Sequence, residues 1–396
     1  MKFSVSMRPS SRFTGRRPRF KGILVVSLIF LFPGVSEAQQ SVPSRKNATQ
    51  TAKIQSHFPE VEELLRQGLI EQAKEKIQEE LQRNSSSVEA YNLLGIIYSD
   101  QKDYASALEA FQHALKLDPH STRTRNNLGN VYVAEEKPDL AEREFRTILG
   151  LDPANRDGNY NLGLLLMAKG QPTEAIVHFQ RVRPANVQTS FNLIRALLQA
   201  RRTAEGRKAA TELSAQNKDD VQLHFTLGVL LASEKQYPAA QLELEKAIAL
   251  QPETFEILFN LGQTCLRGGE YTKAEQALNR ALKLKPDSPE TLYLLAQVYA
   301  DQTKPVDALD LLVRAHKLAP LNTDIIFLLA QVSMSQNYFE DAIPLLESGL
   351  KIAPQRVDLY AALGESYFMS GKAERAIEEF KTLIQQIGRA SCRERV

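Results

Sequence analysis

The sequence contains few arrangements of side chains that could perform chemistry. It has no HExxH, CxxC or GxSxG element and no glycine-rich phosphate loop. Two Cys, no Trp and 5 Met exclude a disulfide framework or a cysteine-rich metal protein. We therefore expect no enzyme, no catalytic residue, no bound metal and no cofactor. The histidines are scattered and never paired four residues apart: His57, His113, His120, His178, His224 and His316.

Acidic and basic residues are abundant, but their spacing is typical of solvated helix surfaces. Glu243, Glu245 and Lys246 are an example, and we expect them on a helix exterior. His178 is likewise expected on a solvated helix face. The formal charge of +2 arises at the chain ends, because residues 39–386 carry 39 basic against 45 acidic side chains. Bulk charge therefore gives no reason to expect a nucleic-acid partner.

Residues 1–38 have the pattern of an export signal. A basic stretch precedes the apolar run Ile23–Phe32, and Ser36-Glu37-Ala38 supplies small residues at the cleavage-defining positions. The run is shorter than the roughly 20 residues that span a bilayer. We expect an exported protein, periplasmic or extracellular, with no stable membrane span after cleavage and a polar linker over 39–53. A retained N-terminal anchor is the alternative.

The last ten residues, 387–396, resemble the in-frame translation of a common sequencing adapter. They do not follow the pattern of the rest of the chain, so we exclude them from fold reasoning as not native. We then expect the natural protein to continue beyond Gln386. Cys265 becomes the one native cysteine, which leaves no internal disulfide.

The segment between the two ends is one unit repeated. A small residue preceded by Leu recurs at intervals of 34, 34, 31 and then five times 34 residues, with Ile194 at the equivalent place in one degenerate copy (187–220). The nine positions are Gly95, Gly129, Gly163, Ile194, Gly228, Gly262, Ala296, Ala330 and Gly364. A second small residue follows twelve positions later in each copy, such as Ala107 or Gly206, and Pro commonly stands twelve further on.

Each unit is expected to form two helices. Apolar residues stand at helical spacing on both sides of a Gly-rich or polar turn, and Pro ends the second helix. The paired small residues are expected to let the two helix backbones approach closely. A single pair cannot bury its apolar face, so neighbouring pairs must stack.

With these residues, the chain resembles the tetratricopeptide-repeat family. The resemblance covers nine copies over residues 88–386, and residues 54–87 look like a divergent leading copy. It implies an all-α, right-handed superhelical solenoid of helix-turn-helix repeats. It also implies a protein or peptide partner bound in a concave groove lined by the first helices.

Two ladders of residues mark the expected groove. Carboxamides, which can pair with a peptide backbone as donor and acceptor, stand two residues before the small residue at Asn127, Asn161, Asn192 and Asn260. Aromatic residues, which are common interface anchors, stand three residues before it at Tyr160, Phe191, Phe225, Phe259, Tyr293 and Phe327. Packing between helices is the alternative role for both ladders.

The degenerate copy is the most individual part of the chain. Pro184 comes three residues early, which predicts a preceding helix about one turn shorter. Ile194 is expected to force its helix pair apart and produce a local kink. Basic residues gather there, and Arg195 is expected to project into the groove and receive an acidic stretch of the partner. A solvated basic surface is the alternative. The basic residues are Arg181, Arg183, Arg195, Arg201, Arg202, Arg207 and Lys208.

These patterns favour a non-catalytic scaffold that binds extended polypeptide, in an envelope assembly or secretion complex of a bacterium. The alternative is the substrate-recruiting arm of a larger enzyme, a peptidase or glycosyltransferase, whose catalytic domain lies beyond residue 386. Artefactual self-association through the truncated last repeat is a further expectation, through Tyr360, Leu363, Tyr367 and Phe380.

Overall fold

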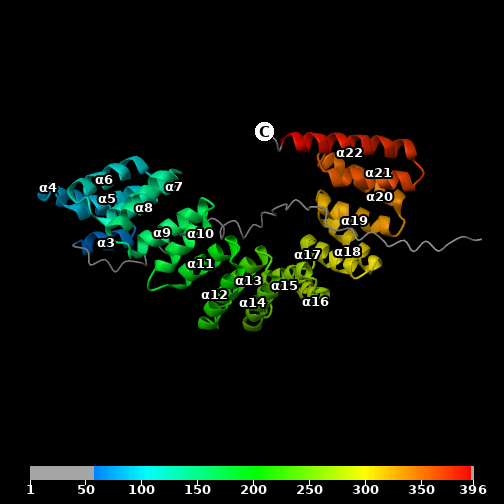
Figure 1. The fold of residues 1–396 in the computed structure, drawn as a ribbon, viewed down its shortest axis with the longest axis horizontal. Coiled ribbons are helices and arrows are strands. Elements are labelled where there is room, and N and C mark those ends of the chain that lie inside the picture. Colours follow the sequence, from blue (N-terminus) through cyan, green and yellow to red (C-terminus); the bar gives the residue numbers. More distant parts are fainter. Residues whose placement is uncertain (1–57, 394–396) are drawn as a thin grey trace, which may run out of the picture. The chain divides into compact units, whose positions relative to one another are not determined.

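The computed structural model describes residues 58–393, and every regular element in this range is a helix (Figure 1). The predicted signal peptide and polar linker lie outside the described residues. The chain divides into two compact units at Leu69. Helix α3 (Pro59–Arg66) is the described part of the first unit, and α4 (Ile70–Arg83) opens the second. Within the described range, no helix is both long and apolar enough to cross a membrane.

After α4 the second unit contains helices in pairs. The first helices of the pairs are α5 (Val88–Asp100), α7 (Thr122–Ala134), α9 (Arg156–Ala168), α11 (Val187–Gln199), α13 (Val221–Ser233), α15 (Phe255–Gly268), α17 (Pro289–Asp301), α19 (Thr323–Ser335) and α21 (Val357–Met369). The second helices are α6 (Tyr104–Leu117), α8 (Pro138–Leu151), α10 (Pro172–Arg181), α12 (Thr203–Gln216), α14 (Tyr237–Leu250), α16 (Tyr271–Leu284), α18 (Pro305–Leu318), α20 (Phe339–Ile352) and α22 (Ala373–Arg393).

Local sequence explains where these helices begin. Most first helices follow a Ser, Asn or Asp whose side-chain oxygen accepts a hydrogen bond from a backbone N–H of the first turn, as Ser121 does from Thr124. Several second helices start at Pro, which is preorganised for a first turn and needs no N–H partner there. The turns inside the pairs use left-handed residues, Gly170 among them.

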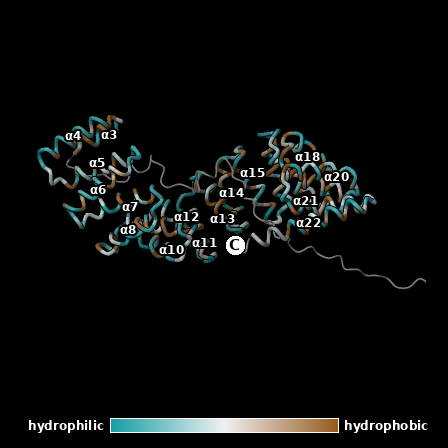
Figure 2. Tube along the Cα trace, turned by 90° about the horizontal axis from the view of Figure 1, so that it is seen from above, coloured by the Kyte–Doolittle hydropathy of each residue, from teal (hydrophilic) through white to brown (hydrophobic). Residues whose placement is uncertain are grey.

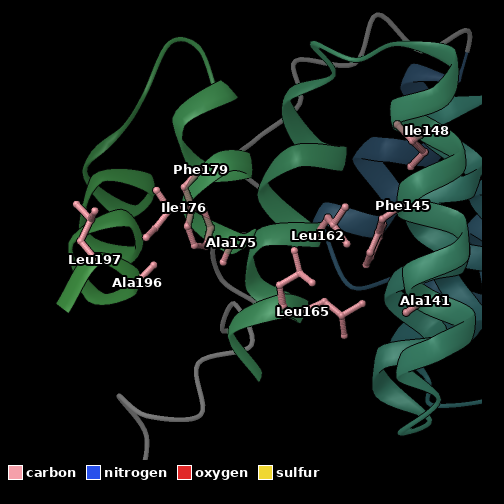
Figure 3. Close-up of a cluster of buried hydrophobic side chains, with 11 residues drawn as sticks. Ala141, Phe145, Ile148, Leu162, Leu165, Ala175, Ile176, Phe179, Ala196 and Leu197 are labelled. Atoms are coloured by element: carbon pink, nitrogen blue, oxygen red, sulfur yellow. The ribbon is translucent and has the colours of Figure 1, made fainter. Parts of the chain in front are cut away.

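Packing follows the order of the chain, which confirms the expected all-α solenoid of helix-turn-helix repeats. Each second helix packs against its own first helix and against the next one, and most neighbouring first helices also touch. Apolar and polar residues are interspersed along the helices (Figure 2). The apolar ones form continuous clusters such as that of α8 to α11, where Phe145, Leu162 and Phe179 are fully buried (Figure 3).

The recurring glycine makes room for a side chain of the second helix. A Cβ added to Gly95 would come 2.5 Å from the ring of Phe111, and one added to Gly262 would come 2.5 Å from Leu278. Both partners stand sixteen residues later, on the second helix. At Gly228 the added Cβ would also come 3.3 Å from the carbonyl oxygen of Ala240, its paired small residue, so the two backbones approach closely there as expected.

In the degenerate repeat the large and small residues of this pair are exchanged. Helix α10 has 10 residues where the other second helices before α22 have 14, which confirms the predicted loss of one turn. Ile194 occupies the usual small position, and Ala210 stands sixteen residues later, where other repeats have Phe or Leu. Both are buried in one cluster. Ala210 provides room beside Ile194, but α11 and α12 contact each other less extensively than the helices of the other pairs do. The separation of this pair and the kink stay predictions.

The packing is thin at one place, between α12 and α13, where other second helices contact the next first helix extensively. A buried polar network joins the helices there, beside the apolar cluster of α11 to α14. His224 Nδ1 lies 2.8 Å from Glu243 Oε2, and Lys246 Nζ donates to Glu243 Oε1 at 2.7 Å and to Ser214 Oγ at 2.8 Å. His224 Nε2 donates to the carbonyl oxygen of Lys218 at 3.0 Å, because that oxygen can only accept. We call this the α12–α14 polar network.

Two expectations about charged helix faces are wrong as a result. Glu243 is only 3% exposed and belongs to this network rather than to a helix exterior. His178 is 7% exposed, and its Nδ1 lies 3.0 Å from Asn159 Oδ1 across the α9–α10 pair. Desolvation lowers the pKa of His178, while Glu174 opposes that shift. Periodicity alone does not show that a polar residue has a partner on the next helix.

The last repeat also differs from expectation. Leu363 and Tyr367 are buried in the cluster of α19 to α22, so they cannot mediate self-association. The ring of Phe380 lies against Gly364 and is 37% exposed. The other exposed large apolar side chains among the described residues of this repeat are Val357, Phe368, Met369, Ile377, Ile384 and Ile387.

Candidate ligand-binding face

Three positions of each first helix share one side of that helix. They are the residue three before the recurring small residue, the residue after it, and the residue four after it; in α15 these are Phe259, Gln263 and Leu266. Their spacing of four and three residues places them in one column, because a helix turns by about 100° per residue. We call these columns together the first-helix face. The columns of neighbouring repeats lie next to one another, because most neighbouring first helices touch.

The Asn ladder is engaged inside the protein. Asn127 Nδ2 donates to Asn92 Oδ1 at 3.0 Å, and Asn161 Nδ2 donates to Asn126 Oδ1 at 2.7 Å. Asn192 follows the same rule with Tyr160, whose hydroxyl accepts at 3.2 Å. Each bond joins a first helix to the preceding one. These donors hold repeats together, which leaves the amide oxygens as the free part of the ladder.

Asn260, the fourth residue of the Asn ladder, makes no such hydrogen bond to the preceding first helix. The residue that Asn260 would reach on the preceding first helix is Phe225, which has no acceptor. Asn260 Nδ2 donates instead to the carbonyl oxygen of Glu256 in its own helix at 2.8 Å. Thr226, which faces Phe191 in the same register, also bonds only to its own helix.

The aromatic residues of the second ladder lie on the first-helix face, but their side chains are buried or half-buried. Phe259 is 7% exposed and stacks on Phe255 with centroids 5.8 Å apart. Tyr160, Phe191, Phe225, Tyr293 and Phe327 are half-buried. Burial raises the pKa of Tyr293 to about 12. These rings therefore offer a partner only part of their surface.

Arg195 stands on the same face of α11 and lacks a partner. Its side chain is half-buried, and its Nε is buried without a hydrogen-bond acceptor. Desolvation lowers the pKa of this guanidinium, and the nearby Tyr160 opposes the shift. Burial likewise raises the pKa of Tyr160, against the hydrogen bond from Asn192 and the charge of Arg195. Tyr160, Asn192 and Arg195 thus meet at one spot with an unneutralised positive charge.

The other basic residues of this region are less available than their number suggests. Arg202 makes a bidentate pair with Glu205, at 2.7 and 2.6 Å. Arg183 donates to the carbonyl oxygen of Val182, and Lys208 lies 3.9 Å from Glu212. Arg181, Arg201 and Arg207 are exposed and have no ion pair within the described range. Of the predicted basic cluster, Arg195 is the member that combines burial with a missing acceptor.

A row of glutamines on the same face was not predicted. Gln263, Gln297 and Gln331 each follow the small residue of their repeat, in three successive copies. They occupy the position that Arg195 has in α11. The sequence analysis compared the residues two and three positions before the small residue between repeats. The same comparison of the residue after it would have revealed the glutamines.

The described residues contain no group of three or more His, Cys, Asp or Glu side chains placed to hold a metal ion. Cys265 is buried, and desolvation raises the pKa of its thiol to about 11. The thiol is therefore protonated at neutral pH and is a poor nucleophile.

Comparison with known families agrees with this architecture. Sequence models of the tetratricopeptide repeat match residues 88–121, 126–187, 166–227, 234–289 and 333–389. The model described as "Anaphase-promoting complex, cyclosome, subunit 3" matches residues 278–349. The chain belongs to the tetratricopeptide-repeat family. No curated protein matches the sequence.

Several solved structures are similar to parts of the chain. A crystal structure of MamA is 24% identical, with a TM-score of 0.40, over 41% of this chain and 96% of its own. A second MamA structure gives 23% and 0.41, over 43% and 93%. YrrB, described as a TPR protein with an unusual peptide-binding site, gives 21% and 0.39, over 46% and 93%.

Proposed function

We propose that this chain is a non-catalytic scaffold that binds an extended polypeptide along its first-helix face. The proposal places it in an exported assembly or secretion complex of a bacterial envelope. Membership of the tetratricopeptide-repeat family supports a protein or peptide partner. The observation that carries the proposal is Arg195, a half-buried cation with an unbonded Nε on that face.

An anionic side chain of the partner would complete this site. A buried charge without a counter-charge is costly, and a carboxylate within hydrogen-bond distance would offset that cost. Asn192 and Tyr160 are already bonded to each other, so neither neutralises the guanidinium. The site therefore favours an Asp or Glu in a polypeptide that crosses α11, with neighbouring residues lying over the adjacent first helices.

Fluorescence anisotropy with a fluorescein-labelled peptide of alternating Asp and Ser tests the proposal. We expect Arg195→Ala to weaken binding about tenfold, since a charge-assisted hydrogen bond contributes about 1.5–3 kcal/mol. Binding of the wild type should also weaken between low and physiological salt. The matched control is Arg207→Ala, an exposed arginine on the second helix α12, and an Asn-for-Asp peptide is the control probe.

The result expected is that only Arg195→Ala lowers affinity and that the Asn peptide binds weakly to every variant. Equal effects of Arg195→Ala and Arg207→Ala would reduce the binding to non-specific surface charge and contradict the proposed site.

A further inference from the structure

The glutamine row on α15, α17 and α19 is unlike the rest of the first-helix face. Gln331 is exposed, and Gln263 and Gln297 are half-buried. Neither Gln263 nor Gln331 has a hydrogen-bond partner among the described residues. Gln297 Nε2 donates one hydrogen bond, to the Tyr293 hydroxyl at 2.9 Å. Each carboxamide therefore retains at least one free N–H donor.

The row lies between two apolar rows. One turn before it stand Phe259, Tyr293 and Phe327, and one turn after it stand Leu266, Ala300 and Met334. All six are buried or half-buried, so apolar surface borders each glutamine on both sides.

Some of the charges near this strip are engaged. Glu256 pairs with Lys285 at 3.0 Å, and Asp324 pairs with Arg356 at 2.7 Å. Arg267 and Asp301 are exposed next to Leu266 and Ala300 and have no ion pair among the described residues. The glutamine row and the two apolar rows themselves contain no charged side chain, which distinguishes the strip from the Arg195 site and favours an uncharged ligand.

The distance between successive first helices favours one backbone conformation of a bound peptide. Helices α15, α17 and α19 touch in succession, and packed helices lie about 8–10 Å apart. A polyproline II helix has three residues per turn and rises about 3.1 Å per residue, so one side of it returns every ~9 Å. A β-strand presents the same side every ~6.8 Å and would lose register with the glutamines.

The chemistry of such a segment also fits. A polyproline II helix makes no internal hydrogen bonds, so its carbonyl oxygens can accept from the glutamine N–H groups. Proline has no N–H, so donors are what the binding surface must supply. Pyrrolidine rings are apolar and pack against aromatic-lined grooves.

We propose that α15, α17 and α19 bind a proline-rich segment of the partner as a polyproline II helix of about nine residues, three to each first helix. The inference rests on the proposed function, because it uses the same first-helix face. It adds the class of segment that the later repeats recognise and separates it from the acidic group received at Arg195.

The test uses the full chain and two uncharged, fluorescein-labelled 12-residue probes. One is a repeat of Pro-Pro-Ala, which forms polyproline II, and the other is a flexible Gly-Ser repeat. We expect the wild type to bind the proline probe and not the Gly-Ser probe. The double variant Gln263→Met/Gln331→Met keeps side-chain size but removes the donors, and should bind the proline probe about tenfold more weakly. The matched control is Gln276→Met, on an exposed side of the second helix α16.

Equal binding of the two probes, or an unchanged affinity of the double variant, would overturn the inference. If the Asp-Ser probe binds through Arg195 while the proline probe does not, the inference fails and the proposed function stands. If neither the acidic nor the proline probe binds, both fail.

Discussion

We divide the protein into an N-terminal block, α5–α12, and a C-terminal block, α13–α22. Equivalent positions connect successive first helices in both blocks, but the side chains at these positions are mainly polar in the first block and mainly apolar in the second. In the N-terminal block, the pairs Asn92–Asn127, Asn126–Asn161 and Tyr160–Asn192 are hydrogen-bonded. The equivalent residues of the C-terminal block are Phe259 and Leu294, Tyr293 and Leu328, and Phe327 and Ala362. The first joint of the C-terminal block, between Phe225 and Asn260, is mixed. One backbone arrangement thus accommodates polar, apolar and mixed joints.

The two blocks meet where neither solution is used. Phe191 and Thr226 do not match, the packing of α12 on α13 is thin, and the α12–α14 polar network lies across that joint. Coupling between the blocks therefore combines this polar network with the buried apolar cluster that runs from α11 to α14. The variants below should break or sharpen this difference.

The largest effect is expected from Glu243→Ala. It leaves His224 and Lys246 without their shared partner, and breaking a buried ion pair costs about 3–5 kcal/mol. Because repeats couple through nearest neighbours, urea unfolding followed by circular dichroism should separate into two transitions. The control, Glu245→Ala on the same helix, removes an exposed pair with Lys273 and should change the free energy of unfolding by under about 1 kcal/mol. Equal losses for both variants would exclude the network as the coupling element.

The reversed pair Ile194 and Ala210 should show strong coupling. Ala210→Leu overpacks a buried site and is expected to lower the free energy of unfolding by about 1–3 kcal/mol. Combined with Ile194→Ala, the loss should be smaller than the sum of the two single losses by at least ~0.5 kcal/mol. Strict additivity in the double-mutant cycle would contradict direct size matching.

Opposite exchanges in the two blocks compare the polar and apolar joints directly. Leu294→Asn buries an amide beside Phe259, which has no acceptor, and should cost about 1–3 kcal/mol of unfolding free energy. Asn127→Leu removes one hydrogen bond and should cost about 1 kcal/mol. Urea unfolding measures both values, and a larger loss for Asn127→Leu would reverse the comparison.

The smallest effect concerns tyrosine ionisation. Burial raises the pKa of Tyr293 to about 12 from 10.0, so its neutral form is favoured by folding. Its contribution to stability is complete below pH ~10 and is lost as pH rises towards ~12. The difference in absorbance at 295 nm between wild type and Tyr293→Phe should show this late titration. A midpoint near 10 would mean that the ring is not sequestered as the structure describes.

The repeat pattern predicted the fold almost completely, because a 34-residue recurrence of small and apolar residues leaves one way to pair helices. Glu243, His178 and the Asn donors were misassigned for a common reason. Their partners stand 19 to 35 residues away on other helices, and a helical pattern reports exposure only with respect to its own helix. Ala210, the small residue in the same cluster as Ile194, was not identified because it lies on the next helix.

Some residues of the candidate binding face were singled out from the sequence, and their role in binding stays a prediction. Arg195 was found because it breaks the regularity of its repeat, and it is the member of the basic cluster that lies on the face with an unbonded Nε. The glutamine row was missed because glutamine is common on solvated helices. Its meaning appears only when the rows before and after it are seen to be apolar.

Site-specific photocrosslinking tests the central claim most directly. A benzophenone side chain replaces Val229, which lies on the first-helix face between Arg195 and Gln263, or Val313, which is 58% exposed on the second helix α18. With the labelled Asp-Ser peptide, we predict crosslinking at position 229, its loss on Arg195→Ala, and none at 313. Equal crosslinking at both positions, or crosslinking at 313 alone, would contradict binding along the first-helix face.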